Sequence, residues 1–175
     1  MSLYHKYRPQ SLSQLVGNAD TVEALDKYLE DPERSPHAFL LHGETGTGKT
    51  TVARIIAARL ECTGGDVKEV DSADFRGIDT VREIRKQSQY LPLNSPRRVW
   101  IIDECHKMTN DAQNALLKIL EDPPSFVYFI LCTTEPNKVI KTIQGRCVQF
   151  QLQLLSDNQM MKLLRRVSKH EGEPL

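Results

Sequence analysis

The chain has little of what marks secreted, membrane-spanning or metal-stapled proteins. Its 175 residues include four cysteines, and no two of them form a C-x-x-C pair, which argues against a zinc cage and a disulfide framework. We expect reduced, mostly buried thiols. The sequence also has no long apolar run and no charged-then-apolar leader, so it predicts neither a membrane span nor a secretory signal. The expected location is cytoplasmic.

Net charge, internal repeats and low-complexity stretches are absent as well. The 23 basic and 23 acidic residues balance, so no overall field draws the protein onto nucleic acid. Any contact with DNA must therefore be local. A length of 175 residues suits one domain with a sizeable core and the start of a second.

The most informative motif that is present is a phosphate loop of the form G-x-x-x-x-G-K-T. A polyphosphate needs many converging backbone N–H donors, which glycines permit, and the positive end of a helix dipole. In this motif Lys49 reaches the β- and γ-phosphates, and the Thr50 hydroxyl ligates Mg²⁺. The residues expected to bind a nucleoside triphosphate here are Gly43, Glu44, Thr45, Gly46, Thr47, Gly48, Lys49, Thr50 and Thr51.

A second nucleotide-binding element ends in the carboxylates Asp103 and Glu104, which follow the apolar run 99–102. In a parallel sheet such a strand ends beside the phosphate loop. Asp103 can then hold the Mg²⁺ ion, and Glu104 can polarise an attacking water. An acidic pair at a strand end is ordinary by itself, so this interpretation depends on the phosphate loop upstream.

The two following residues extend the string to D-E-C-H, which some nucleic-acid helicases carry as D-E-x-H. The stretch from Lys49 to Asp103 is short for those helicases, and 175 residues leave no room for their second motor lobe. We therefore interpret Cys105 and His106 as residues that pack at the start of a helix rather than as catalytic groups.

Short apolar runs alternate with helical patterns along the chain, which is typical of a parallel sheet covered by helices on both faces. The near-continuous apolar run 126–132 indicates the central strand. Strands are expected at 38–41, 67–71, 98–102, 126–132 and 148–150, and helices at 21–30, 49–61, 78–90, 109–121, 136–145 and 156–169.

Several strings occur in an order that resembles the ATPase domain of AAA+ clamp-loader subunits, the family of the bacterial DNA polymerase III gamma/tau subunit and the replication factor C small subunits. The resemblance runs from Tyr4 to about Lys169. It rests on Lys6-Tyr7-Arg8-Pro9, Leu15-Val16-Gly17, the phosphate loop, residues 71–79, Asp103-Glu104, residues 114–124 and Gly145-Arg146-Cys147. The cysteine cluster that bacterial members carry after the phosphate-loop helix is missing here.

The resemblance implies a fold and a domain division. The fold is α/β, a P-loop NTPase of the AAA+ type, with a parallel five-stranded sheet, helices on both faces and the start of a helical lid. The nucleotide-binding domain is expected at residues 1–153 and the first lid helix at 154–175. A complete lid with its sensor-2 arginine and a collar do not fit, so we expect a fragment that binds nucleotide weakly and is monomeric when isolated.

The implied function is that of an ATP-hydrolysing subunit of a sliding-clamp loader in DNA replication. In this family ATP and Mg²⁺ binding drives clamp opening and primer-template DNA binding within a ring of clamp-loader subunits, and hydrolysis releases the clamp on DNA. A non-hydrolysing scaffold subunit and another AAA+ or helicase-type motor remain alternatives. The intact phosphate loop and Glu104 favour hydrolysis over a scaffold role.

The family also implies an N-terminal box around the adenine and ribose, and a polar sensor-1 residue that helps to orient the attacking water beside the γ-phosphate. The alternatives are an N-terminal arm packed on the core and a simple strand-end cap. The box corresponds to Tyr7, Arg8, Pro9, Val16 and Gly17, and the sensor-1 position to Thr134.

Arg146 corresponds to the family's arginine finger, which reaches into the nucleotide of a neighbouring subunit and neutralises charge on the transferring phosphoryl group. Gly145 replaces the usual serine, which loosens the turn before the finger. The alternative is an ion pair between Arg146 and a surface acid. With Glu104, Lys49 and Thr134, Arg146 completes the expected catalytic set.

DNA contacts in this family follow the backbone with helix N-termini and a few basic or polar side chains. Arg76 follows the second strand in a glycine-containing turn, and a solvated loop charge is its alternative role. The residues expected to contact DNA are Arg76, Lys107, Thr109 and Asn110.

Overall fold

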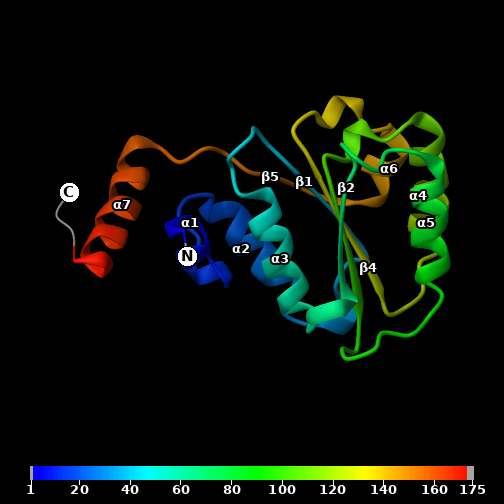
Figure 1. Cartoon of the computed structure of the whole chain (residues 1–175), viewed down its shortest axis with the longest axis horizontal. Coiled ribbons are helices and arrows are strands. Elements are labelled where there is room, and N and C mark those ends of the chain that lie inside the picture. The colour runs from blue at the N-terminus through cyan, green and yellow to red at the C-terminus, as the bar shows by residue number, and fades with distance from the viewer. Residues whose placement is uncertain (1, 173–175) are drawn as a thin grey trace.

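Five parallel strands cross the middle of the molecule in the order β2-β3-β4-β1-β5 (Figure 1). The structure, a computed structural model, describes residues 2–172. All seven residues of β4 are buried between β3 and β1, which confirms the prediction that this run is the central strand. The strands are β1 (Ala38–His42), β2 (Val67–Asp71), β3 (Arg98–Asp103), β4 (Val127–Thr133) and β5 (Val148–Gln151).

Helices cover both faces of the sheet, and each face has its own apolar cluster (Figure 1). Residues of α2 and α3 pack on Tyr128, Ile130 and Cys132 of β4, while residues of α4, α5 and α6 pack on the alternate residues of the same strand. The helices are α1 (Leu3–Lys6), α2 (Ala19–Tyr28), α3 (Lys49–Arg59), α4 (Ile78–Gln87), α5 (Asn110–Glu121), α6 (Lys141–Arg146) and α7 (Asp157–Glu171). The predicted AAA+ type of fold, with a five-stranded parallel sheet, is thus confirmed.

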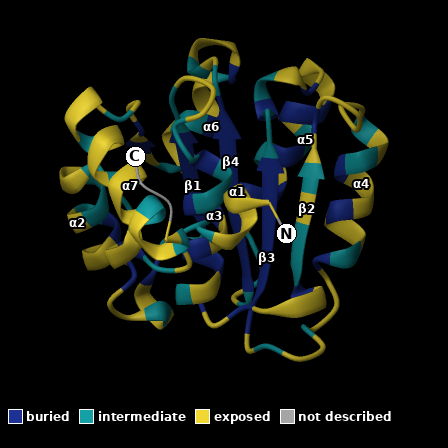
Figure 2. Ribbon diagram, turned by 60° about the vertical axis from the view of Figure 1, so that its left-hand side comes forward, coloured by how far each residue is buried: buried dark blue, intermediate teal, exposed yellow. Residues whose placement is uncertain are grey.

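Figure 2 shows the result: β1, β3 and β4 are dark, between helices with largely exposed faces, while the edge strand β2 is half-buried or exposed. Cys62, Cys105 and Cys132 are buried and Cys147 is half-buried, which confirms the expectation of mostly buried thiols. Among residues 2–172, no helix is both long enough and apolar enough to cross a membrane.

The helix predicted at 136–145 is wrong in its first half. Residues 136–138 form a single 3₁₀ turn, and α6 begins only at Lys141. The buried side chain of Gln113 explains the break. Its amide donates to the carbonyl of Lys138 at 3.3 Å and accepts from the N–H of Ile140 at 2.9 Å, so these backbone groups bond to a side chain of α5 instead of continuing a helix.

The helix predicted at 78–90 also ends earlier, at Gln87. The buried guanidinium of Arg98 on β3 donates to the carbonyls of Gln87 and Tyr90, the latter at 2.9 Å. These carbonyls are satisfied by a strand residue, so the chain leaves the helix and enters the loop that leads to β3.

The loop between α4 and β3 is organised by one buried carboxylate. Asp66 is 0% exposed and accepts hydrogen bonds from the backbone N–H groups of Leu93, Asn94 and Ser95 at 2.8, 2.7 and 3.0 Å. Burial by itself raises the pKa of Asp66, but the three N–H donors and the Arg98 guanidinium, 3.8 Å away, outweigh burial and lower it.

We expect Asp66→Asn to lower the free energy of unfolding by about 2 kcal/mol at neutral pH, because an amide replaces the charged acceptor of these N–H groups. Since folding lowers the pKa of Asp66, its contribution is complete above the unfolded pKa of about 3.9 and is lost as the pH falls through the folded value. The stability difference between wild type and variant should therefore shrink below about pH 4.

Urea unfolding at several pH values measures this difference. The exposed Asp74 provides the control substitution, Asp74→Asn. An Asp66→Asn variant as stable as wild type at pH 7 would show that the buried carboxylate does not hold the loop.

Candidate nucleotide-binding site

The phosphate loop lies at the edge of the sheet where the strands end. It connects His42, the last residue of β1, to Lys49, the first residue of α3. The N–H of Gly43 donates to the carbonyl of Thr133 at 3.3 Å, and the N–H of Leu152 donates to the carbonyl of His42 at 2.8 Å. A Cβ at Gly43 would lie 2.2 Å from the Leu152 carbonyl oxygen, so only glycine fits here.

The loop offers backbone donors rather than side chains. Gly46 and Gly48 have φ of 85° and 91°, in the left-handed region that glycine favours, and open space surrounds both. Gly48 is the N-cap of α3 and makes no side-chain cap bond. The first N–H groups of this 11-residue helix have no partner one turn back, which suits an anion such as a phosphate.

Lys49 places its charge over this loop. Its Nζ donates to the carbonyls of Gly43 and Glu44, both at 2.8 Å, and the residue is only 6% exposed. Among residues 2–172, only neutral carbonyls hold this buried ammonium, and a buried charge is stabilised by an anionic partner. A phosphate group is the complementary ligand.

The two predicted metal ligands are in direct contact. Thr50 Oγ1 donates to Asp103 Oδ2 at 2.6 Å, which joins the first turn of α3 to the end of β3. A hydroxyl and a carboxylate are hard oxygen donors of the kind that Mg²⁺ takes, usually together with phosphates and waters. The residues present therefore fit Mg²⁺ bound with a nucleotide.

Glu104 follows in a left-handed conformation, with φ of 50°, which is costly for a residue other than glycine. Its Oε2 lies 3.4 Å from Thr134 Oγ1, 3.4 Å from His106 Nε2 and 4.0 Å from Lys107 Nζ. The structure thus brings the predicted sensor-1 residue to the predicted catalytic carboxylate.

Sequence reasoning missed the place of His106. The packing interpretation is confirmed for Cys105, which is buried, whereas the His106 ring lies between the carboxylates of Glu104 and Glu135. Its Nδ1 is 2.9 Å from Thr133 Oγ1. Thr133 ends β4 and Glu135 follows it, far along the chain from His106, so spacing around the D-E-C-H string could not reveal these contacts.

The predicted adenine box is divided in the structure. Val16 and Gly17 line a small cavity of about 30 Å³ together with Thr47 and Val52, next to the phosphate loop. The hydroxyl of Tyr7 instead donates to Glu171 of α7. The Arg8 guanidinium lies 4.6 Å from the centre of the Tyr4 ring, and Pro9 is half-buried. Among residues 2–172, the contacts of Tyr7 and Arg8 join the N-terminal arm to itself and to α7.

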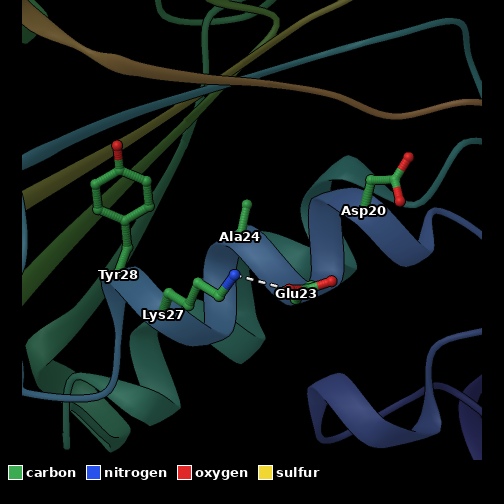
Figure 3. A pocket seen from close by; sticks show the side chains of 5 residues that line it. All are labelled: Asp20, Glu23, Ala24, Lys27 and Tyr28. Carbon is green, nitrogen blue, oxygen red and sulfur yellow. Dashed lines mark hydrogen bonds and ion pairs between the residues drawn. The ribbon is translucent and has the colours of Figure 1, made fainter.

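The volumes of two open hollows do not identify the nucleotide site, because the larger of the two lies elsewhere. One, of about 420 Å³, lies between the phosphate loop, Thr134 and residues 151–154. Another, of about 530 Å³, runs along α2, where its chemistry is limited to surface groups such as the Glu23 and Lys27 ion pair at 2.7 Å (Figure 3). Of the two, only the first hollow is lined by residues of the phosphate loop and by Thr134.

Arg146 lies away from this site. It ends α6 just before β5, at the edge where the parallel strands begin, whereas the phosphate loop lies where they end. The guanidinium is half-exposed and lies 3.4 Å from Glu121, which is the surface pairing considered from the sequence. Arg146 therefore does not reach the nucleotide site of its own chain.

The four residues expected to contact DNA share one exposed region. The N–H of Thr109 donates to the carbonyl of Arg76 at 3.0 Å, which ties the loop after β2 to the start of α5. Thr109 Oγ1 also caps α5 by accepting from the N–H of Ala112 at 3.2 Å. All four are exposed: Arg76, Lys107, Thr109 and Asn110.

Curated relatives match nearly the whole chain. It is 40% identical to the DNA polymerase III subunit gamma/tau of Mycobacterium tuberculosis over 98% of its length, and 36% identical to the DNA polymerase III subunit gamma of Buchnera aphidicola (subspecies Schizaphis graminum) over 97%. The chain covers 34% of the first relative and 52% of the second. It thus spans between about a third and a half of these proteins.

Two family profiles match parts of the chain. The one described as DNA polymerase III, delta subunit, matches residues 66–156, just over half of the chain. The one described as Zeta toxin matches residues 21–94, which include the phosphate loop.

Solved structures from Thermotoga maritima share the fold. A gamma subunit-related protein of DNA polymerase III is 28% identical, with a TM-score of 0.67 over 82% of this chain and 49% of that one. The RuvB Holliday junction branch migration motor has a TM-score of 0.76 and 22% identity, over 95% of this chain and 55% of that one. The second likeness supports the fold alone.

Proposed function

The chain belongs to the family of AAA+ clamp-loader subunits that includes the bacterial DNA polymerase III gamma/tau proteins, and we propose that it hydrolyses ATP in the loading of a sliding clamp onto DNA. One observation carries the proposal: Thr50 contacts Asp103 beside the phosphate loop, and Glu104 follows at the same edge of the sheet. A damaged phosphate loop or a missing glutamate would have favoured a non-hydrolysing scaffold subunit. In this chain the loop motif is complete and Glu104 is present.

We propose that the N–H groups at the start of α3 and Lys49 hold the ATP phosphates, and that Thr50 and Asp103 hold Mg²⁺. The bound ion would offset the negative charge of the phosphates. Val16 and Gly17 support an adenine site, because they adjoin the loop at Thr47. The assignment of Tyr7, Arg8 and Pro9 to that site stays a prediction.

Glu104 is the proposed group that polarises the attacking water, with Thr134 beside its carboxylate. Thr134 can donate from its hydroxyl either to Glu104 or toward a reacting phosphate. The strained backbone at Glu104 supports this assignment, since strain of this kind is concentrated at functional sites.

We expect Glu104→Gln to retain Mg·ATP binding and to stop turnover, because an amide is isosteric but cannot act as a base. Lys49→Ala should instead abolish binding, since it removes the buried cation over the loop. Calorimetry and steady-state hydrolysis on the complete polypeptide in its assembled complex separate the two effects. Glu23→Gln, on the exposed surface of α2, is the control, and normal hydrolysis by Glu104→Gln would refute the assignment.

Arg146 is proposed to act on the nucleotide of a neighbouring subunit. Its place at the far edge of the sheet supports action in trans, and the weak surface pair with Glu121 can be exchanged for a phosphate. The partners in such a ring would be other clamp-loader subunits.

We expect Arg146→Ala to leave nucleotide binding by the isolated chain unchanged and to slow hydrolysis by the assembled complex about a hundredfold or more. Comparing binding to the chain with single-turnover hydrolysis in the complex tests this. Arg82→Ala, at an exposed arginine paired with Asp79, is the matched control. An Arg146→Ala complex that hydrolyses ATP as fast as the control would exclude a finger at this position.

Primer-template DNA is the proposed nucleic-acid partner. The backbone bond between Thr109 and Arg76 supports a shared contact surface, since it holds the exposed loop after β2 against the N-terminus of α5. The roles of Lys107 and Asn110 on this surface rest on their exposure and position.

We expect Arg76→Ala to reduce the stimulation of ATP turnover by primer-template DNA and to make DNA binding less salt-dependent, because one phosphate contact is lost. Turnover by the complete complex, titrated with DNA at several salt concentrations, measures both effects. Arg85→Ala on the exposed face of α4 serves for comparison. Unchanged stimulation in Arg76→Ala would remove this residue from the DNA surface.

We also propose that α7 begins the lid. No residue of α7 is buried, and Lys6 of the N-terminal arm contacts Glu171 near its end at 2.6 Å. Ser156 and Gln159 form a capping box that fixes where the helix starts. The division into residues 1–153 and 154–175, the weak nucleotide binding of the isolated chain and its monomeric state stay predictions.

A further inference from the structure

The ring of His106 lies in a polar cluster with Glu104, Glu135 and Thr133. Its side chain is only 5% exposed, and three groups contact its two nitrogens. Nε2 is 3.2 Å from Glu135 Oε2 and 3.4 Å from Glu104 Oε2, while Nδ1 is 2.9 Å from Thr133 Oγ1. One buried imidazole thus joins the proposed base to the segment after β4.

These contacts define the tautomer of a neutral His106. Two carboxylates face Nε2, and an unprotonated Nε2 would direct its lone pair at two negative charges. The proton must therefore be on Nε2. Nδ1 then accepts from the Thr133 hydroxyl, whose oxygen already accepts from the N–H of Glu135 at 3.0 Å and whose own proton is free to donate.

The Nε2 proton also explains how two carboxylates stay close together. Glu104 and Glu135 repel each other, and a donor shared between them, on a ring that is itself nearly buried, offsets that repulsion. Lys138 contacts Glu135 from the other side at 3.0 Å, and its hydrogen bond lowers the pKa of that carboxyl, which favours the anionic form of Glu135.

We propose that His106 is a positioning residue for Glu104. The ring, oriented by Thr133 and Glu135, holds one carboxylate oxygen, Oε2, through its Nε2 proton, which leaves Oε1 to polarise water. The inference rests on the proposed hydrolysis for its consequence in turnover. Its structural half, the tautomer and the contact with Glu104, does not depend on a nucleotide.

Two substitutions separate the Nε2 donor from the rest of the ring. A glutamine side chain can place an amide N–H near the position of Nε2, whereas an asparagine reaches only as far as Nδ1. We expect His106→Asn to lower kcat about tenfold to a hundredfold with unchanged Mg·ATP affinity, and His106→Gln to retain most of the turnover. His5→Asn, at an exposed histidine, is the control.

These rates are measured on the complete polypeptide in its assembled complex, with thermal unfolding of each variant as the test of folding. Wild-type kcat in His106→Asn would overturn the proposal. So would equal losses in both variants with folding intact, because packing of the ring rather than its donor would then explain them.

A second readout needs no nucleotide. In ¹⁵N-histidine NMR we expect His106 as the Nε2–H tautomer, with an Hε2 resonance that shifts in Glu104→Gln and Glu135→Gln but not in Glu23→Gln. Thr133→Val, which removes the donor to Nδ1, should weaken the tautomer preference. An Nδ1–H tautomer, or an Hε2 resonance indifferent to Glu104, would refute the inference.

The two proposals fail differently. If the wild-type complex does not hydrolyse ATP while Hε2 responds to Glu104, the proposed function is wrong and the His106 contact stands. If the complex hydrolyses ATP and His106→Asn is as active as the control, only the positioning role is wrong.

Discussion

The contact between Thr50 and Asp103 depends on β1 and β3 running in the same direction. Parallel strands end at one edge, so the loop after β1, the acidic pair after β3 and the polar residues after β4 all arrive there. A single antiparallel strand among these three would place one of the groups at the opposite edge. The chemistry of the site therefore depends on chain direction before it depends on any side chain.

The central position of β4 brings further polar groups to this edge of the sheet. Because β4 pairs with both β1 and β3, its end meets the phosphate loop through the Thr133 carbonyl and meets Glu104 through Thr134. The same turn carries Glu135 to His106. All seven residues of β4 are buried in the core, and the residues at its end and just after it supply polar groups around the proposed base.

Much of this arrangement could be predicted because it is local. The phosphate loop, the carboxylates after an apolar run and the all-apolar run of β4 are each contained in a few consecutive residues, and the strands expected from them agree closely with the structure. Helix ends were less predictable. Gln113 interrupts the helix expected at 136–145 and Arg98 ends α4, and both act through side chains from elsewhere in the fold.

The sequence by itself determined which residues form the phosphate-loop motif, which carboxylates follow an apolar strand, and that the sheet is parallel. Local patterns suffice for these because periodicity and motif spacing act over a few residues. Only the tertiary structure decided that His106 contacts Glu104 and Glu135, that Tyr7 bonds to α7, and that Arg146 lies at the far edge. Those contacts join segments distant in the chain, where packing of the folded sheet and helices, rather than spacing, determines which side chains meet.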